Sequence, residues 1–331
     1  MESVKLKDIA DALGVSNVTV SNALSGKKGV SSEVREKVIK MAKELGYDLS
    51  RYEKTGKGSK IGVIVADKYI EVGASFYWAM YQQVVYAASK KLGVTVFEVL
   101  NMDDEEKGIL PKMLLGKSVD GIIVLGCIKK EYIEKLVYQA GVPVVLLDFC
   151  VDDIPCDAVM SGNYIGMYKA TRYLLDRGHR DIVFVGSVQA NENIMDRFFG
   201  YKKALMESGI KLRKGWKLED RDLVTGEIQV ELPENMPTAF VCNSDLTASY
   251  LYDVLIAKGY RIPQDVSIVG YDNYLFGHSF AENLTTYNVD MKTMAEIAVK
   301  LLMGKIRGIE KRFGTRYIDS EMIERGSVKK L

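Results

Sequence analysis

From residue 60 onward, short apolar runs rich in Val and Ile alternate with segments of helical periodicity. The runs read KIGVIVAD, VTVFEV, DGIIVLG and PVVLLD, followed further along the chain by DIVFVGS, TAFVCNSD and VSIVGYDN. Continuous apolar strands are typical of parallel sheets that are covered by helices on both faces. The alternation therefore predicts an α/β body of two doubly wound parallel-sheet lobes in succession. Helices are expected at residues 76–92, 103–115, 130–140, 165–177, 197–208 and 248–258.

The first 50 residues follow a different pattern, in which apolar residues recur at helical spacing. Two helices are predicted from two sets of such residues, Leu6, Ile9, Ala10 and Leu13 in the first and Val34, Val38, Met41, Ala42 and Leu45 in the second. Gly14 ends the first helix, and the second lies between Ser31 or Ser32 as N-cap and Gly46. The head of the chain is therefore expected to be all-helical.

Between these helices the stretch GVSNVTVSNALSG, residues 14–26, has conflicting signals. Its β-branched residues and a period of two favour a strand. A strand would have no partner in a helical head, whereas a helix from about Asn17 places Val20, Ala23 and Leu24 on one buried face. We therefore predict a third helix, with its opposite face formed by Asn17, Val18, Ser21, Asn22 and Ser25.

A helix, a tight turn and a second helix with a polar outer face are typical of a helix-turn-helix, which places short polar side chains in the major groove of DNA. Residues 1–60 hold twelve Lys/Arg and eight Asp/Glu, a net charge of +4, and the remainder of the chain carries −3. A basic head on an acidic body fits a polyanionic partner. From spacing alone, a small helical bundle that binds a protein is an alternative.

The head closely resembles the DNA-binding head of the lactose-repressor (LacI/GalR) family. The resemblance covers the first 47 residues and rests on KDIA, GVS, TVS, VS and R-x-K-V with A-K-E-L-G-Y. It implies that Asn17, Val18 and Asn22 read bases of double-stranded DNA. It assigns Ser16, Thr19, Ser21 and Ser25 to backbone-contacting or flanking positions. Many relatives carry Arg where this chain has Asn22, and Asn pairs with adenine whereas Arg prefers guanine.

The body resembles the effector domain of the same family, through IGVIVAD, DGIIVLG, VPVVLLD, GHRDIVFVG, RFFGY, IPQDVSIVGYDN and EMIERGSV. The family implies a periplasmic-binding-protein-like body in which the chain crosses three times between lobes that enclose a small ligand, usually a sugar or purine. The expected division is a DNA-binding head at 1–50, a linker at 51–59 and an effector-binding and dimerisation domain at 60–331. The first lobe would hold about 60–160 and 291–318, and the second about 161–290 and 319–331.

The resemblance also implies a set of ligand-binding residues. Polar positions carried over are Asp148, Arg197, Asp272 and Ser244, the last of which stands where relatives often have Asn. Aromatic positions are Phe76, Tyr77 and Phe149, whose rings suit the C–H face of a sugar; packing in the core is an equal alternative for Phe76 and Tyr77. A hexose or small glycoside is the expected ligand. Asp245 is expected to cap the helix that follows it.

Several function classes lack their signatures. Gly116-Lys117-Ser118 is followed by a strand and preceded by Pro111, so it is not a phosphate loop. No dinucleotide fingerprint, GxSxG elbow or metal-ligand spacing occurs, so neither an enzyme nor a cofactor is expected. No apolar run approaches the roughly 20 residues that span a bilayer, so no membrane partner is expected. Four cysteines without CxxC spacing and the absence of a signal peptide suggest a cytoplasmic protein.

The sequence as a whole is interpreted as a ligand-responsive repressor that binds a palindromic operator as a homodimer. The alternative is a sugar-binding receptor that has no role in transcription. The linker departs most from the family, whose members carry a hinge helix with a leucine that wedges into the minor groove. Here YDLSRYEKTGKGSK has Gly56 and Gly58 and no leucine after Leu49, and only Tyr52 is bulky. A flexible, weakly basic tether is expected instead.

Overall fold

The computed structural model describes residues 4–24, 29–47, 58–70, 75–223, 225–275, 277–309 and 312–331. The predicted DNA contact Ser25 and most of the linker, including Tyr52 and Gly56, lie outside these ranges. The expectation of a flexible tether without a wedge therefore stays a prediction. Among the described residues, none of the helices has the length and apolar character that crossing a membrane requires.

The head consists of α1 (Leu6–Leu13), α2 (Asn17–Leu24) and α3 (Ser32–Glu44). The prediction of a helix rather than a strand after Asn17 is confirmed. Val20, Ala23 and Leu24 of α2 are buried in one cluster with apolar residues of α1 and α3, so tertiary packing outweighs the β propensity of the segment. Gly14 ends α1 in the left-handed conformation (φ 64°), and the Ser31 hydroxyl caps α3 by accepting the Val34 N–H.

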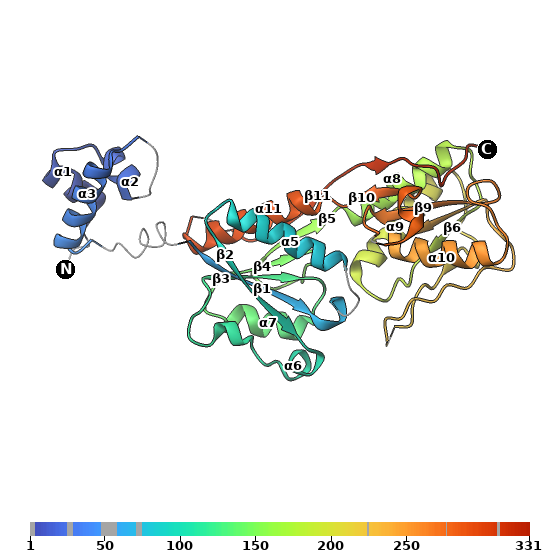
Figure 1. Cartoon of the computed structure of the whole chain (residues 1–331), viewed down its shortest axis with the longest axis horizontal. Helices are drawn as coiled ribbons and strands as arrows, with labels where there is room; N and C mark the ends of the chain where they lie inside the picture. Colours follow the sequence, from blue (N-terminus) through green and yellow to red (C-terminus); the bar gives the residue numbers. More distant parts are fainter. Residues whose placement is uncertain are drawn as a thin grey trace.

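The first lobe is a six-stranded parallel sheet in the order β11-β5-β4-β3-β1-β2. Its strands are β1 (Lys60–Ala66), β2 (Val94–Leu100), β3 (Gly121–Leu125), β4 (Val144–Leu147), β5 (Asp157–Ser161) and β11 (Thr315–Ile318). One face is covered by α5 and α11, and the other by α6 and α7 (Figure 1). These helices span Phe76–Ser89, Met291–Ile306, Met102–Lys107 and Lys130–Gln139 respectively, with short 3₁₀ turns at Asp67–Tyr69 and Lys112–Leu114.

The second lobe repeats this plan with a six-stranded sheet in the order β12-β10-β9-β8-β6-β7. Only β12 is antiparallel to its neighbour. The strands of this lobe are β6 (Ile182–Val185), β7 (Lys217–Leu218), β8 (Ala239–Cys242), β9 (Ser267–Asp272), β10 (Thr285–Asn288) and β12 (Met322–Ile323). The helices of this lobe are α8 (Asn163–Asp176), α9 (Glu192–Glu207) and α10 (Asp245–Ala257), and a 3₁₀ turn spans Ser279–Glu282. The chain passes between the sheets after β5, after β10 and after β11. The predicted fold class, a helical head on two α/β lobes, is confirmed.

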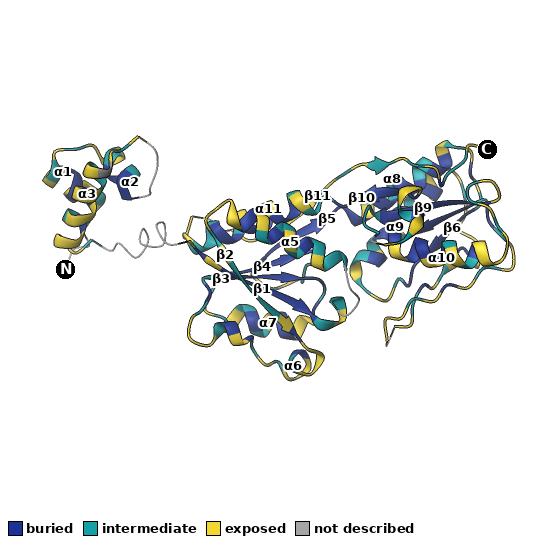
Figure 2. Cartoon of the chain, viewed as in Figure 1, coloured by how far each residue is buried: buried dark blue, intermediate teal, exposed yellow. Residues whose placement is uncertain are grey.

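Strands β1, β3, β4 and β6, predicted from apolar runs, are buried almost throughout, whereas the outer faces of the helices are exposed (Figure 2). The predicted strand VTVFEV forms β2 at the edge of its sheet and is mostly exposed or half-buried. One helix prediction was wrong. The segment 103–115 is not continuous: α6 ends at Lys107, because Gly108 turns into the left-handed conformation (φ 62°), and Pro111 precedes the separate 3₁₀ turn. Proline lacks the N–H that a helix interior needs, which accounts for the break.

Helices α8 and α9 pack so closely that Gly200 of α9 has no room for a side chain. A β-carbon there would overlap the carbonyl oxygen of Tyr164 in α8 and lie 2.9 Å from the Tyr168 nitrogen. Because α9 also carries Arg197, this contact positions a predicted ligand-binding residue.

We expect Gly200→Ala to destabilise the protein by about 2–3 kcal/mol, since overpacking against backbone cannot be relieved by a side-chain rotation. Helix propensity alone predicts the opposite sign, a gain of about 1 kcal/mol. Urea unfolding measures the difference, with Lys203→Ala on the same helix as the control. An unchanged or increased midpoint for Gly200→Ala would contradict the close packing.

Candidate functional site

The outer face of α2 carries the predicted DNA-reading residues. Asn17 and Val18 are exposed, Val18 to 67%, and Ser21 and Asn22 are half-buried. A solvent-exposed valine beside polar side chains is costly in water but suits contact with a thymine methyl group. The structure therefore places Asn17, Val18 and Asn22 on an accessible helix whose opposite side is core.

Ser16 has a structural role that the sequence analysis did not assign to it. Its hydroxyl accepts the Thr19 N–H at 3.0 Å and lies 2.9 Å from the Thr19 hydroxyl. This is an N-cap, which stabilises a short helix by about 1 kcal/mol. Ser16 and Thr19 thus fix the start of α2, the end expected to enter the groove.

In the body, Asp148, Arg197 and Asp272 lie where polar side chains of the two lobes meet. Asp148 follows β4 in the first lobe, and Asp272 ends β9 in the second; both have positive φ, 68° and 114°. Arg197 on α9 is 6% exposed, and its Nη1 lies 3.4 Å from Asp272 Oδ1. The guanidinium also lies over the Tyr271 ring, 3.8 Å from its centroid. Buried charges need such partners.

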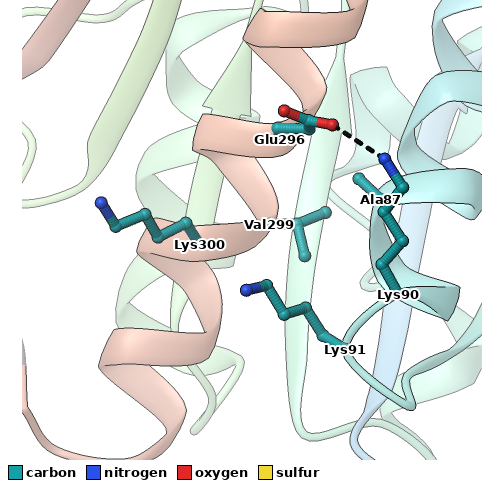
Figure 3. A pocket seen from close by; sticks show the side chains of 6 residues that line it. All are labelled: Ala87, Lys90, Lys91, Glu296, Val299 and Lys300. Atoms are coloured by element: carbon teal, nitrogen blue, oxygen red, sulfur yellow. Dashed lines mark hydrogen bonds and ion pairs between the residues drawn. The ribbon is translucent and has the colours of Figure 1, made fainter.

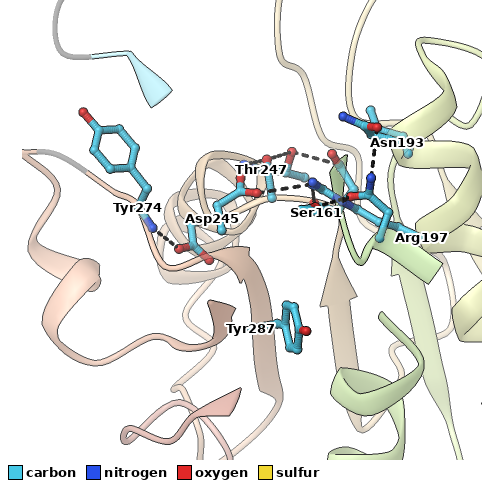
Figure 4. A network of polar contacts seen from close by, with 12 residues as sticks. Ser161, Asn193, Arg197, Asp245, Thr247, Tyr274 and Tyr287 are labelled. Atoms are coloured by element: carbon cyan, nitrogen blue, oxygen red, sulfur yellow. Dashed lines mark hydrogen bonds and ion pairs between the residues drawn. The ribbon is translucent and has the colours of Figure 1, made fainter. Parts of the chain in front are cut away.

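A chain of hydrogen bonds joins Arg197 to Asp148 across the lobes. Figure 4 shows Arg197 and Asn193 of this chain. Arg197 Nε donates to Asn163 Oδ1 at 2.8 Å, Asn163 donates to Asn193 Oδ1 at 2.9 Å, and Asn193 donates to the Asp148 carbonyl at 2.9 Å. Arg197 also donates to the Asn243 carbonyl at 2.6 Å. The arrangement fixes the arginine between the end of the first sheet and the end of the second.

The Asp148 carboxylate is only half satisfied. Its Oδ2 accepts the Tyr77 hydroxyl at 3.0 Å, but its Oδ1 is buried and has no hydrogen-bond partner. Burial raises the pKa of Asp148 to about 6, against the opposing effects of Arg197 and Tyr77. A buried oxygen without a partner costs about 1–3 kcal/mol and is best explained by a group that it would accept from.

Aromatic rings line the approach to this carboxylate. Tyr77 lies 4.5 Å from Tyr69 and 5.3 Å from Phe76, centroid to centroid. Phe76 in turn meets Tyr274 of the second lobe edge-on at 6.1 Å. Phe76 and Tyr77 therefore pack against the core and also border the polar residues, and their contact with a ligand stays a prediction.

The other two candidates lie elsewhere or are already engaged. Phe149 is buried in the core on the α6–α7 face of the first sheet. Ser244 caps α10 by accepting the Thr247 N–H at 3.0 Å. The prediction that Asp245 is this cap was wrong. Asp245 is buried and accepts from the Thr286 hydroxyl at 2.6 Å and the Tyr274 N–H at 2.8 Å.

The sequence analysis missed a second set of polar residues at the same edge of the second sheet. Asp220 is fully buried and accepts from Asn243 at 2.7 Å, from Thr247 at 2.6 Å and from both nitrogens of the Arg221 fork. Burial opposes its charge, but these donors outweigh that effect and lower the pKa of Asp220 to about 2. Of these residues, only Asn243 could have been found from the sequence, because it directly follows an apolar run that predicts a strand.

Comparisons with known proteins match both parts of the chain. Residues 5–49 match the family of bacterial regulatory proteins, lacI family, and residues 171–328 match the periplasmic binding protein-like domain. The HTH-type transcriptional repressor PurR of Mannheimia succiniciproducens is 28% identical over 336 residues, covering 98% of this chain and 99% of the relative. The Ribose operon repressor of Haemophilus influenzae is 27% identical, with 98% of each covered.

Two solved structures of similar fold cover nearly the whole chain. The transcriptional regulator CelR–cellobiose complex superimposes with a TM-score of 0.68 at 24% identity, covering 98% of this chain and 99% of that one. The lac repressor dimer bound to operator and the anti-inducer ONPF gives a TM-score of 0.68 at 21% identity, with coverages of 99% and 100%. At these identities the likeness shows the fold.

Burial raises the pKa of Asp245 to about 7, in spite of its hydrogen bonds with Thr286 and Tyr274. The folded state therefore holds this proton more tightly than the unfolded state, whose pKa is about 3.9. Stability from Asp245 is present at low pH and is lost as pH rises from about 4 through about 7. We expect Asp245→Asn to flatten the fall in unfolding free energy across this window, by up to a few kcal/mol at 1.4 kcal/mol per pKa unit. Urea unfolding of both proteins at pH 5 and at pH 8 measures this difference. An equal change in unfolding free energy between the two pH values for both proteins would contradict the prediction.

Proposed function

Because the chain belongs to the lacI family of bacterial regulatory proteins, we propose that it is a repressor which binds a palindromic operator as a homodimer, under the control of a small ligand held between its lobes. The named relatives are repressors, so the prediction that the chain is not an enzyme is confirmed. The observation that carries the ligand half of the proposal is the buried, unpartnered Oδ1 of Asp148 between two lobes.

The α2 helix supports the DNA half. Its apolar side is committed to the head's core, and its start is fixed by Ser16, so the exposed Asn17 and Val18 are presented on a rigid element. Asn22 lies on the same helix, and an asparagine amide pairs with adenine N6 and N7 in the major groove. An intact helix-turn-helix argues against the alternative of a receptor with no role in transcription.

Two copies are needed to read a palindrome, and the body has apolar surface to join them. On the first lobe, Trp78, Tyr86, Val94 and Val99 of α5 and β2 are exposed. On the second, α10 exposes Leu246, Tyr250 and Ile256. Exposed apolar side chains gathered on two elements favour association. Strand β2 is also the free edge of its sheet.

The chemistry between the lobes favours a neutral polyol, and a sugar is the ligand we propose. Arg197 faces two carboxylates, Asp148 and Asp272, so no excess of positive charge exists there to hold an anion. Carboxylates accept paired hydrogen bonds from vicinal hydroxyls, and a guanidinium donates paired hydrogen bonds to them. Phe76 and Tyr274 offer rings to a C–H face. Among relatives, the Ribose operon repressor and the cellobiose-bound regulator carry sugars in their names, which supports this class.

The DNA half predicts a symmetric motif. Selection from random duplexes with the full-length chain should return a palindrome, because two α2 helices are related by a two-fold axis. Asn22→Ala should weaken operator binding by about 1–3 kcal/mol and relax base preference at one symmetric pair of positions. A selection that returns no palindrome would contradict the proposal of a homodimeric repressor. Glu36→Ala on α3 is the control for Asn22→Ala.

The ligand half predicts a pH dependence. A sugar hydroxyl that donates to Asp148 Oδ1 stabilises the carboxylate, so the pKa of Asp148 falls from about 6 when ligand binds. Affinity should be full above pH 6 and should drop as pH falls below it, by up to about tenfold per pH unit. A thermal-shift screen of sugars identifies the ligand. Asp148→Asn should weaken binding and remove the pH dependence while operator binding without ligand persists. The same pH profile in both proteins would place the ligand elsewhere.

A further inference from the structure

We propose that the end of the first lobe where the linker enters is a second DNA-binding surface, on which a groove between α5 and α11 holds phosphates of the duplex that flanks the operator. The proposal rests on the proposed function, since it requires that the head binds DNA. It goes beyond that function because it gives the body, whose residues 61–331 carry a net charge of −3, a direct contact with DNA.

The groove is lined by three lysines and one glutamate over a small apolar floor (Figure 3). Its residues are Ala87, Lys90, Lys91, Glu296, Val299 and Lys300, and its volume is about 270 Å³. Glu296 pairs with Lys90 at 3.1 Å, and both side chains are nearly half exposed. Within the part of the chain that the structure describes, no carboxylate pairs with Lys91 or Lys300. The groove therefore presents an excess of two positive charges to solvent.

The groove lies at the linker end of the lobe because of how the sheet is built. Lys90 and Lys91 follow the end of α5 and come just before β2, whose first residue Val94 pairs with Lys60 and donates to the Ser59 carbonyl at 2.9 Å. Strand β1 thus begins beside the lysines. The last turns of α11 pack against the same end of the sheet, since a side chain at Gly121, the first residue of β3, would meet Leu302 and Ile306.

Further cations gather at this end, where they outnumber the carboxylates. Lys60, Lys117 and Arg307 are exposed at the starts of β1 and β3 and at the end of α11. Asp120 accepts the Lys60 N–H at 2.9 Å, and Asp157 is buried against Lys305 at 3.1 Å. The surface is therefore basic although the body as a whole is acidic, which is charge complementarity to a polyanion.

The head keeps this surface close to DNA. The chain between Tyr47, the last described residue of the head, and Gly58 can extend at most about 40 Å, at roughly 3.3–3.6 Å per residue. Duplex DNA carries one phosphate charge per roughly 1.7 Å of axis. An operator-bound head thus holds a dense row of anions within reach of Lys91 and Lys300. A second copy of this chain is a weaker occupant, because its body carries net negative charge without such a row.

The test compares full-length protein on two duplexes, the operator alone and the operator extended by ten or so base pairs on each side. Neutralising Lys90, Lys91 and Lys300 together to Gln should lower the slope of log affinity against log salt by about 2 on the extended duplex, at about 0.9 per phosphate contact. The short duplex should bind nearly as before. Changing the same lysines to Arg should leave the slope as in the unchanged protein, because the charge is kept. Glu296→Gln should steepen the slope, because the substitution releases Lys90 from its ion pair.

The matched control changes Lys211, Lys214 and Lys258, which are exposed on the second lobe, to Gln and removes the same charge. Equal slopes for the groove variant, the control and the unchanged protein on the extended duplex would overturn the proposal. If the groove variant loses affinity for inorganic phosphate or an acidic protein but binds both duplexes normally, DNA is the wrong occupant. Failure of the unchanged protein to bind either duplex would instead reject the repressor function.

Discussion

The buried guanidinium of Arg197 is the interaction on which the arrangement of the body depends. It reaches the crossover after β5 through Asn163, the end of β8 through the Asn243 carbonyl, and the end of β9 through Asp272. A buried cation is tolerated only when such partners satisfy it. Each partner is therefore fixed in place by the same charge. The position of Arg197 depends in turn on the close packing of α9 against α8, where Gly200 admits no side chain.

This arrangement gives the two lobes a direct connection that a ligand can alter. Asn193 of the second lobe donates to the Asp148 carbonyl of the first, and Phe76 meets Tyr274 across the same boundary. A ligand that satisfies Asp148 Oδ1 favours whichever lobe arrangement presents that oxygen best. It can shift the equilibrium only by its difference in affinity for the two arrangements. Strand β1 begins directly after the linker, so in the proposed repressor it is the route by which such a shift would reach the head.

The sequence predicted the elements whose signals are local. Apolar runs predicted β1, β3, β4, β6, β8 and β9, and the resemblance placed Asp148, Arg197 and Asp272 together. Strands β10 and β11 were missed because TTYN and TRYI are polar. The buried hydroxyl of Thr286 donates to Asp245, which lies 41 residues earlier, and accepts the Asn273 N–H. Asn163 and Asn193 were missed for the same reason, since their value comes from a chain of bonds that no spacing along the sequence encodes.

Charge placement matters more to this protein than its net charge. Residues 61–331 carry a net charge of −3, which would repel DNA if it acted as a single charge. At physiological salt, however, screening limits each charge to about 8 Å. Only groups near the duplex then contribute, and those at the linker end of the first lobe are predominantly lysine and arginine. Asp157 there is paired with Lys305, and Asp120 accepts the backbone N–H of Lys60. The carboxylates Asp148 and Asp272 follow β4 and end β9, at the opposite end of the strands. The polarity of the parallel sheet therefore separates the two proposed sites: the proposed DNA-binding surface lies at strand starts, and the proposed ligand site lies at strand ends.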